Sequence, residues 1–183
     1  MKYLIVFIAM AFVPFLSNAQ EVEISDSKFG FALISSFNNE VNPIRLTPSV
    51  SYFSGNNQFE LGVGFHPFIQ EEQKIISSEL NYKYFPNGFD KKFNMYMMVS
   101  FAYLNNSRET YYPATYHYLF LNAGYGFQTT LSKNIYLGTN ANFGIFTYSK
   151  NSENPYHNYL KGKGLFNEFG FNFELELTLG YRF

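Results

Sequence analysis

The sequence predicts an all-β fold, specifically an eight-stranded antiparallel up-and-down transmembrane β-barrel. Three observations predict it. Apolar and polar residues alternate in repeated segments after residue 20, the period of a strand with two different faces. No helical periodicity appears in the same region. Aromatic residues make up 21% of the chain, with 23 Phe, 16 Tyr and no Trp, as suits the lipid-facing band and interfacial girdles of a membrane barrel.

Eight segments carry the alternation. In the third, Phe59, Leu61, Val63 and Phe65 share one face, and Glu60, Gly62, Gly64 and His66 share the other. The expected strands are 28–37, 44–54, 58–68, 75–85, 93–104, 117–128, 135–147 and 166–183. Turns are expected at 55–57, 86–92 and 129–134 on one side of the barrel. Loops at 38–43, 69–74, 105–116 and 148–165 are expected on the other side, and the last two are long, polar and tyrosine-rich.

The N-terminus reads as an export signal. Lys2 is the positive start, residues 4–16 are apolar, and residues 17–19 are small or polar, so cleavage is expected after Ala19. The alternative is a membrane anchor, but this apolar run contains a proline and is shorter than the roughly twenty residues of a spanning helix. We therefore expect residues 1–19 to be a signal peptide and 20–183 to form one barrel domain.

Composition excludes several classes of site. The chain has no cysteine, which excludes a lipid-anchored N-terminus and disulfides. Without the signal, twelve basic residues face fourteen acidic ones, so no basic surface for nucleic acid is indicated. Three scattered histidines do not have metal-ligand spacing, and no cofactor motif is present.

The polar face of the strands indicates a closed interior. It is rich in glycine, asparagine and serine rather than in the long charged side chains of a water-exposed sheet. The charges that it does carry are of both signs, and buried charges need partners. A soluble β-protein with solvated charges is the alternative. We expect a lumenal polar network formed by Arg45, Glu60, Glu79, Lys83, Glu168, Glu174, Glu176 and Arg182.

Tyrosines near the strand ends suggest interfacial girdles, where the ring stays in the apolar boundary and the hydroxyl meets water. The candidates are Tyr52, Tyr84, Tyr136 and Tyr181 on the turn side, and Tyr103, Tyr118 and Tyr148 on the loop side.

The last strand resembles the C-terminal assembly signal of outer-membrane barrels: Leu177, Leu179, Tyr181 and Phe183 share one face and the chain ends on the aromatic residue. The sequence thus resembles the small outer-membrane barrel superfamily that includes the OmpX and Ail type and the OmpA barrel domain. This resemblance implies an integral protein of a Gram-negative outer membrane, with outer-membrane lipid or lipopolysaccharide around it and the barrel-assembly machinery as its partner during biogenesis.

The sequence predicts the function less specifically than it predicts the fold. The leading hypothesis is a non-enzymatic barrel that supports the envelope or binds a surface partner, or mediates adhesion, through its loops; no motif identifies that partner. Two alternatives are a narrow channel for small solutes and a lipid A deacylase or acyltransferase. The enzyme would need a nucleophile, a base and an acid in reach of one another. Its candidates are His66, His117, His157, Ser107, Glu109, Ser152 and Glu153, but no histidine lies two residues before a serine, as a deacylase motif requires.

Overall fold

The computed structural model describes residues 28–41, 44–67, 73–89, 91–109, 113–152 and 168–183. These residues form eight strands: β1 (Phe29–Asn38), β2 (Arg45–Ser54), β3 (Asn57–Phe65), β4 (Gln73–Tyr84), β5 (Phe93–Arg108), β6 (Ala114–Thr130), β7 (Ile135–Ser152) and β8 (Glu168–Arg182). Each predicted strand has a counterpart. No helix in the described part of the chain has the length and apolar character needed to cross a membrane.

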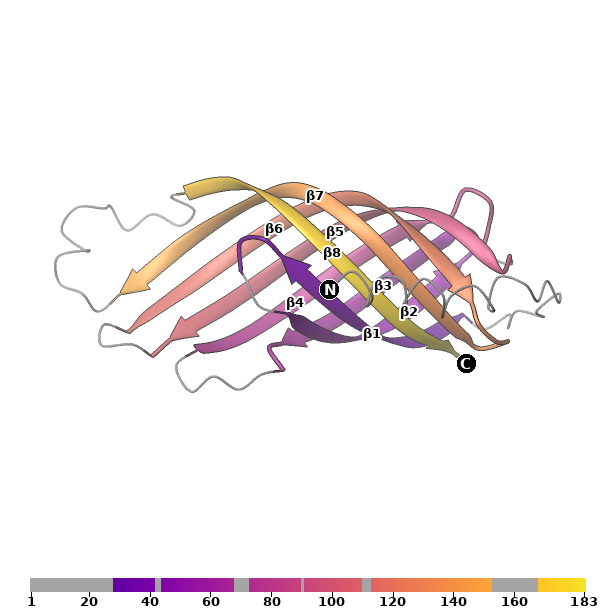
Figure 1. The fold of residues 1–183 in the computed structure, drawn as a ribbon, viewed down its shortest axis with the longest axis horizontal. Helices are drawn as coiled ribbons and strands as arrows, with labels where there is room; N and C mark the ends of the chain where they lie inside the picture. The colour runs from indigo at the N-terminus through magenta and orange to yellow at the C-terminus, as the bar shows by residue number, and fades with distance from the viewer. Residues whose placement is uncertain (1–27, 42–43, 68–72, 90, 110–112, 153–167) are drawn as a thin grey trace, which may run out of the picture.

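The sheet closes on itself. Every strand pairs antiparallel with its neighbours in the sequence, and β1 also pairs with β8, for example through Gly30 opposite Arg182 and Ser36 opposite Glu176. Figure 1 shows the strands winding obliquely around one elongated barrel. The predicted eight-stranded, antiparallel, up-and-down barrel is therefore confirmed.

Short turns gather at the end of the barrel that also holds the C-terminus (Figure 1). The β2–β3 turn contains Gly55, with φ of 55°, and the β4–β5 turn contains Gly88, with φ of 71°. These backbone angles are in the left-handed region that glycine adopts without steric cost. We call this end the turn end and the opposite end the loop end.

Three strands extend at least three residues farther toward the loop end than predicted. β5 continues to Arg108, β6 begins at Ala114 and β7 reaches Ser152, so the predicted loop 105–116 is mostly strand. The pairing continues through Asn106 opposite Tyr116. In this region polar residues occupy both faces, which removes the alternation on which the prediction depended.

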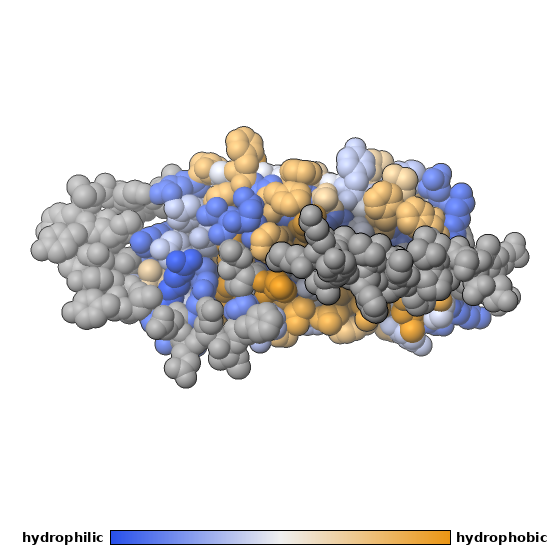
Figure 2. Space-filling model, viewed as in Figure 1, coloured by the Kyte–Doolittle hydropathy of each residue, from blue (hydrophilic) through white to orange (hydrophobic). Residues whose placement is uncertain are grey.

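The side-chain distribution is the reverse of that in a water-soluble protein: apolar side chains lie on the outer surface and polar side chains face the interior. Leu61 and Val63 on the outer face are 64% and 59% exposed, whereas Glu60 on the inner face is 1% exposed. Figure 2 shows an apolar band around the middle of the visible face, with hydrophilic residues toward both ends. The core of this barrel is thus polar in its middle, and its surface carries the apolar side chains.

Glycines in the lumen lie opposite large aromatic rings. Three register pairs share this arrangement, in which a Cβ added at the glycine would overlap the partner's ring: Tyr96 with Gly126, Tyr136 with Gly180, and Phe146 with Gly170. The missing side chain makes room for a ring that fills the lumen. Small residues on the polar face are therefore needed to make room for these rings.

These pairs correct part of the predicted girdle. Tyr136 and Tyr118 are 1% and 5% exposed and pack inside the barrel, and Tyr148 is part of the same interior aromatic group as Tyr118. Their positions share the phase of the lumenal glycines, which turns them inward. Tyr52, Tyr84, Tyr103 and Tyr181 lie on the outer face and are 37–49% exposed.

Candidate functional site: a polar network in the barrel lumen

Arg45 is the centre of the charged group nearer the loop end. It projects inward from β2, and its Nη2 lies 3.3 Å from Oε2 of Glu79 on β4 and 2.8 Å from Oε1 of Glu174 on β8. The side chains are between 1% and 6% exposed. Because these charges are removed from water, each group depends on the others to offset its desolvation.

Asparagines satisfy the remaining carboxylate oxygens of this group. Asn81 donates to Glu79 Oε1 at 2.7 Å and Asn122 donates to Glu174 Oε2 at 3.0 Å. Glu176, deeper in the lumen, accepts from Asn140 at 2.8 Å and from Asn142 at 3.3 Å. Asparagine amides thus stabilise the three carboxylates of this group, of which the Arg45 guanidinium contacts two directly.

A second charged group lies nearer the turn end. Lys83 Nζ is 2.6 Å from Oε2 of Glu60 and 5.3 Å from the centre of the Tyr96 ring. Glu60 Oε1 also accepts hydrogen bonds from Gln58 at 2.6 Å and Ser51 at 3.2 Å. This ion pair is therefore embedded in further polar contacts, the condition for a buried pair to be tolerated.

Side chains from β5 and β7 connect the two groups. Asn140 Nδ2 lies within hydrogen-bond distance of both Glu176, in the first group, and the hydroxyl of Tyr96, at 3.2 Å. The Tyr96 ring in turn lies against Lys83. Polar contacts therefore run along the lumen from Arg45 toward the turn end.

The Arg182 guanidinium packs against three aromatic rings near the turn end of the lumen. Its guanidinium carbon lies 4.7 Å from the ring centre of Phe53, 4.9 Å from Phe89 and 5.1 Å from Tyr136. Its side chain is 1% exposed. The electron-rich ring faces favour the cation at the turn end of the lumen.

Aromatic clusters flank the polar network at both ends. Toward the loop end, Tyr118, Phe120 and Phe146 pack with Val41, Ile75, Ala102 and Leu104. Toward the turn end, Phe85 and Phe89 from the β4–β5 turn pack against Phe53 and Tyr96. We refer to these as the loop-end cluster and the turn-end cluster. They lie in the lumen on either side of the Arg45 and Lys83 groups.

Glu168 lies apart from the other predicted network residues. It is half-buried at the loop end, where the Tyr148 hydroxyl donates to its Oε2. Nearby, Arg108 and Lys150 lie over the Tyr116 ring, at 5.2 and 5.4 Å from its centre. Of the eight predicted residues, the structure places seven deep in the lumen and Glu168 at its mouth.

The catalytic candidates do not assemble into a triad in the described residues. His117 Nδ1 is 2.7 Å from the Tyr103 hydroxyl on the outer face, and Glu109 pairs with Lys74 at 2.6 Å. His66 Nδ1 donates to the Ile44 carbonyl at 3.0 Å. The side chains of His157, Ser152 and Glu153 lie outside the described residues. Within the ranges that the structure describes, no three His, Asp or Glu side chains form a group able to hold a metal.

The predicted assembly residues Leu177, Leu179 and Tyr181 project outward from β8 and are 49–57% exposed, and Phe183 is 64% exposed. Their arrangement on one face agrees with the alternation. Recognition by an assembly machine is not tested by this geometry and stays a prediction.

Sequence reasoning missed the uncharged members of the network. Gln58, Tyr96, Asn122, Tyr136 and Asn140 all make contacts there. They share the inward phase of the charged residues, so a search of that phase for amide and phenol side chains would have found them.

Solved structures with the same fold were identified by comparison. The N-terminal β-barrel domain of Pseudomonas aeruginosa OprF superposes with a TM-score of 0.61 at 11% identity, covering 85% of this chain and 96% of that one. A major outer membrane protein from Thermus thermophilus gives a TM-score of 0.50 at 15% identity, covering 85% and 99%. No family model and no curated protein matches the sequence. At these identities the likeness concerns the fold.

Proposed function

We propose that this chain is an integral outer-membrane β-barrel protein without enzymatic activity, with a closed lumen and a loop end that serves surface binding or envelope structure. One observation carries the proposal: a closed barrel presents apolar side chains such as Leu61 outward and encloses ion pairs such as Lys83 with Glu60. In a closed sheet the backbone N–H and C=O groups bond to neighbouring strands, and the apolar side chains on its outer face can contact lipid chains.

One comparison and two expectations from the sequence support the outer membrane as the location. The two solved barrels of the same fold include a protein described as a major outer membrane protein. The sequence also carries an expected export signal over 1–19 and an expected assembly signal ending at Phe183. The narrower likeness to OmpX, Ail and the OmpA barrel domain belongs to the same proposal.

A non-conducting barrel follows from how the lumen is filled. Eight strands enclose a space that side chains nearly fill. Here the loop-end cluster, the Arg45 and Lys83 groups, and the turn-end cluster follow one another along it. We propose that these groups stabilise the barrel and block a wide pore, so its activity toward partners resides at the loop end.

The loop end offers a preformed surface for a partner. Because β5, β6 and β7 continue as paired strands, residues such as Arg108, Tyr116 and Lys150 are held on rigid backbone. Arg108 and Lys150 are exposed at the rim while resting on the Tyr116 ring. Cationic side chains on paired strands, resting against a half-buried aromatic ring, lose less conformational entropy on binding than the same side chains on a flexible loop would.

Membrane insertion can be tested with a matched pair of variants. Leu61→Arg places a charge on the apolar band, and Ser107→Arg places one on the outward phase of β5 near its loop end. We expect Leu61→Arg to lower the free energy of unfolding in lipid by about 2–4 kcal/mol, and Ser107→Arg to have little effect. Urea titrations of folding into vesicles, read as the shift between boiled and unboiled gel bands, measure both. Equal behaviour of the two variants would refute the proposed orientation.

The proposed lack of a pore and of catalysis requires separate measurements. Reconstituted protein should give no large, steady single-channel conductance in planar bilayers. Lipid A from cells with and without the protein should have identical mass spectra. A steady conductance would favour the channel alternative, and a changed acyl pattern would favour the enzyme.

A further inference from the structure

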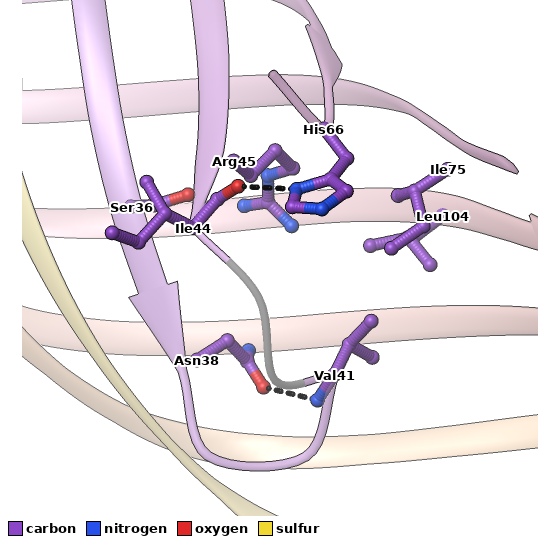
Figure 3. A pocket seen from close by; sticks show the side chains of 8 residues that line it. All are labelled: Ser36, Asn38, Val41, Ile44, Arg45, His66, Ile75 and Leu104. Atoms are coloured by element: carbon purple, nitrogen blue, oxygen red, sulfur yellow. Dashed lines mark hydrogen bonds between the residues drawn. The ribbon is translucent and has the colours of Figure 1, made fainter. Parts of the chain in front are cut away.

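Near the loop end a small cavity lies beside Arg45 (Figure 3). Its volume is about 10 Å³, and Ser36, Asn38, Ile75 and Leu104 are among its lining residues. This volume corresponds to about one water-sized sphere. The cavity is therefore large enough for a single water molecule or a monoatomic ion and too small for an organic ligand.

Two buried polar groups on residues that line this cavity have no hydrogen-bond partner in the described part of the chain. They are the Ser36 hydroxyl and the Arg45 Nε–H group, on residues that are 2% and 5% exposed. Ser36 and Arg45 are directly opposite each other in the β1–β2 register, and inward side chains at such positions have Cβ atoms about 4.5–5.5 Å apart. Leaving both groups without a hydrogen bond would carry the full desolvation penalty of a buried donor at each.

Charge decides which ligand the cavity fits. An anion is disfavoured because Arg45 already faces the carboxylates of Glu79 and Glu174. A cation is disfavoured because the Nε–H of a guanidinium is a donor and carries positive charge. A neutral molecule that can both accept from Nε and exchange a hydrogen bond with a hydroxyl meets both conditions.

We infer that Ser36 and Arg45 bind one ordered water molecule in this cavity. The water accepts a hydrogen bond from Arg45 Nε and makes a second one with the Ser36 hydroxyl. In this position it satisfies the Nε–H of Arg45, whose Nη2 faces Glu79 and Glu174. The side chains of Val41, Ile75 and Leu104 line the apolar part of the cavity, which favours long residence.

A crystal structure of the full refolded protein tests the inference, at a resolution where ordered waters are visible. We expect one density peak about 2.7–3.2 Å from both Ser36 Oγ and Arg45 Nε. A bromide soak should give no anomalous peak there, and replacement of sodium by rubidium should give none either. An absent density peak, or occupancy by either ion, overturns the inference.

Two serine variants sharpen the test. Ser36→Ala removes one of the two partners, so the peak should disappear or move out of reach of Nε. Ser100→Ala removes another buried lumenal hydroxyl, on β5, that does not line this cavity, and the peak should remain. If Ser36→Ala fails to fold, the wild-type maps still decide the question.

Discussion

Lys83 Nζ lies 2.6 Å from Glu60 Oε2, and both side chains are at most 1% exposed. Replacing Lys83 by Met leaves a carboxylate buried without its cation, which typically costs about 3–5 kcal/mol. We expect Lys83→Met to lower the free energy of unfolding in lipid vesicles by that amount, measured by urea titration with a gel-shift readout.

Variants of Glu60 separate the effect of the unpaired charge from the effect of lost packing. Glu60→Gln on its own leaves Lys83 unpaired, whereas the double variant Lys83→Met with Glu60→Gln removes both charges. Because the uncompensated charge is the main cost, the double variant should be more stable than Lys83→Met alone. A double variant whose loss equals the sum of the two single losses would show that the pair is not coupled.

Two lumenal glycines provide a matched test of ring packing. A Cβ at Gly180 would overlap the Tyr136 ring, whereas a Cβ at Gly138 would have its nearest neighbour at 3.5 Å. We expect Gly180→Ala to destabilise the barrel by about 1–3 kcal/mol through overpacking. Gly138→Ala should be neutral or slightly stabilising. The two variants are compared by the temperature at which the compact band of the folded protein disappears from a gel. Equal temperatures would contradict the proposed packing of the Tyr136 ring against Gly180.

Folding into vesicles measures the stability of a variant, whereas accumulation in the outer membrane of cells also depends on the proposed assembly signal. Comparing the two separates the effects. Phe183→Ala removes an exposed ring while its backbone N–H can still donate to the Phe29 carbonyl, 3.1 Å away. We expect the variant to fold normally into vesicles and to accumulate less in the outer membrane of cells. Phe169→Ala, which removes an outward ring at the start of the same strand, should insert normally. Equal insertion of both variants would count against a signal at Phe183.

The two aromatic clusters predict that opening one end does not create a pore. Phe89→Ala removes a ring that packs on Phe53 and Arg182 at the turn end but leaves the loop-end cluster and the ion pairs intact. Single-channel recordings of the variant should therefore stay at the wild-type level. A steady conductance from this one change would mean that the turn-end cluster alone closes the lumen.

Much of this fold could be predicted from the sequence because the two faces of each strand differ in polarity. Every second side chain is apolar and faces outward, so segments such as 58–68 and 93–104 correspond to β3 and β5. The inward phase also identified Arg45 and Lys83 as lumenal residues. Both inferences need only the period of a strand and the cost of burying charge.

Other features depend on distances between strands and could not be predicted in this way. Arg45 meets Glu174, which is 129 residues away in the sequence, because the barrel closes between β1 and β8 with a particular register. The extension of β5 to Arg108 was missed because both of its faces are polar there. The place of Tyr136 near a turn predicts a girdle position, but the inward phase that it shares with Gly138 puts its ring in the lumen.

The orientation of the strands relative to lipid can be measured most directly by spin labelling, because the chain has no native cysteine. Labels at Leu61→Cys and Leu177→Cys, on the outer face, and at Ser100→Cys, in the lumen, are compared in reconstituted vesicles. The outward labels should be relaxed strongly by oxygen and weakly by a water-soluble nickel complex, and the lumenal label should be shielded from both. Outward labels that the nickel complex reaches more readily than oxygen would contradict a lipid-facing apolar surface.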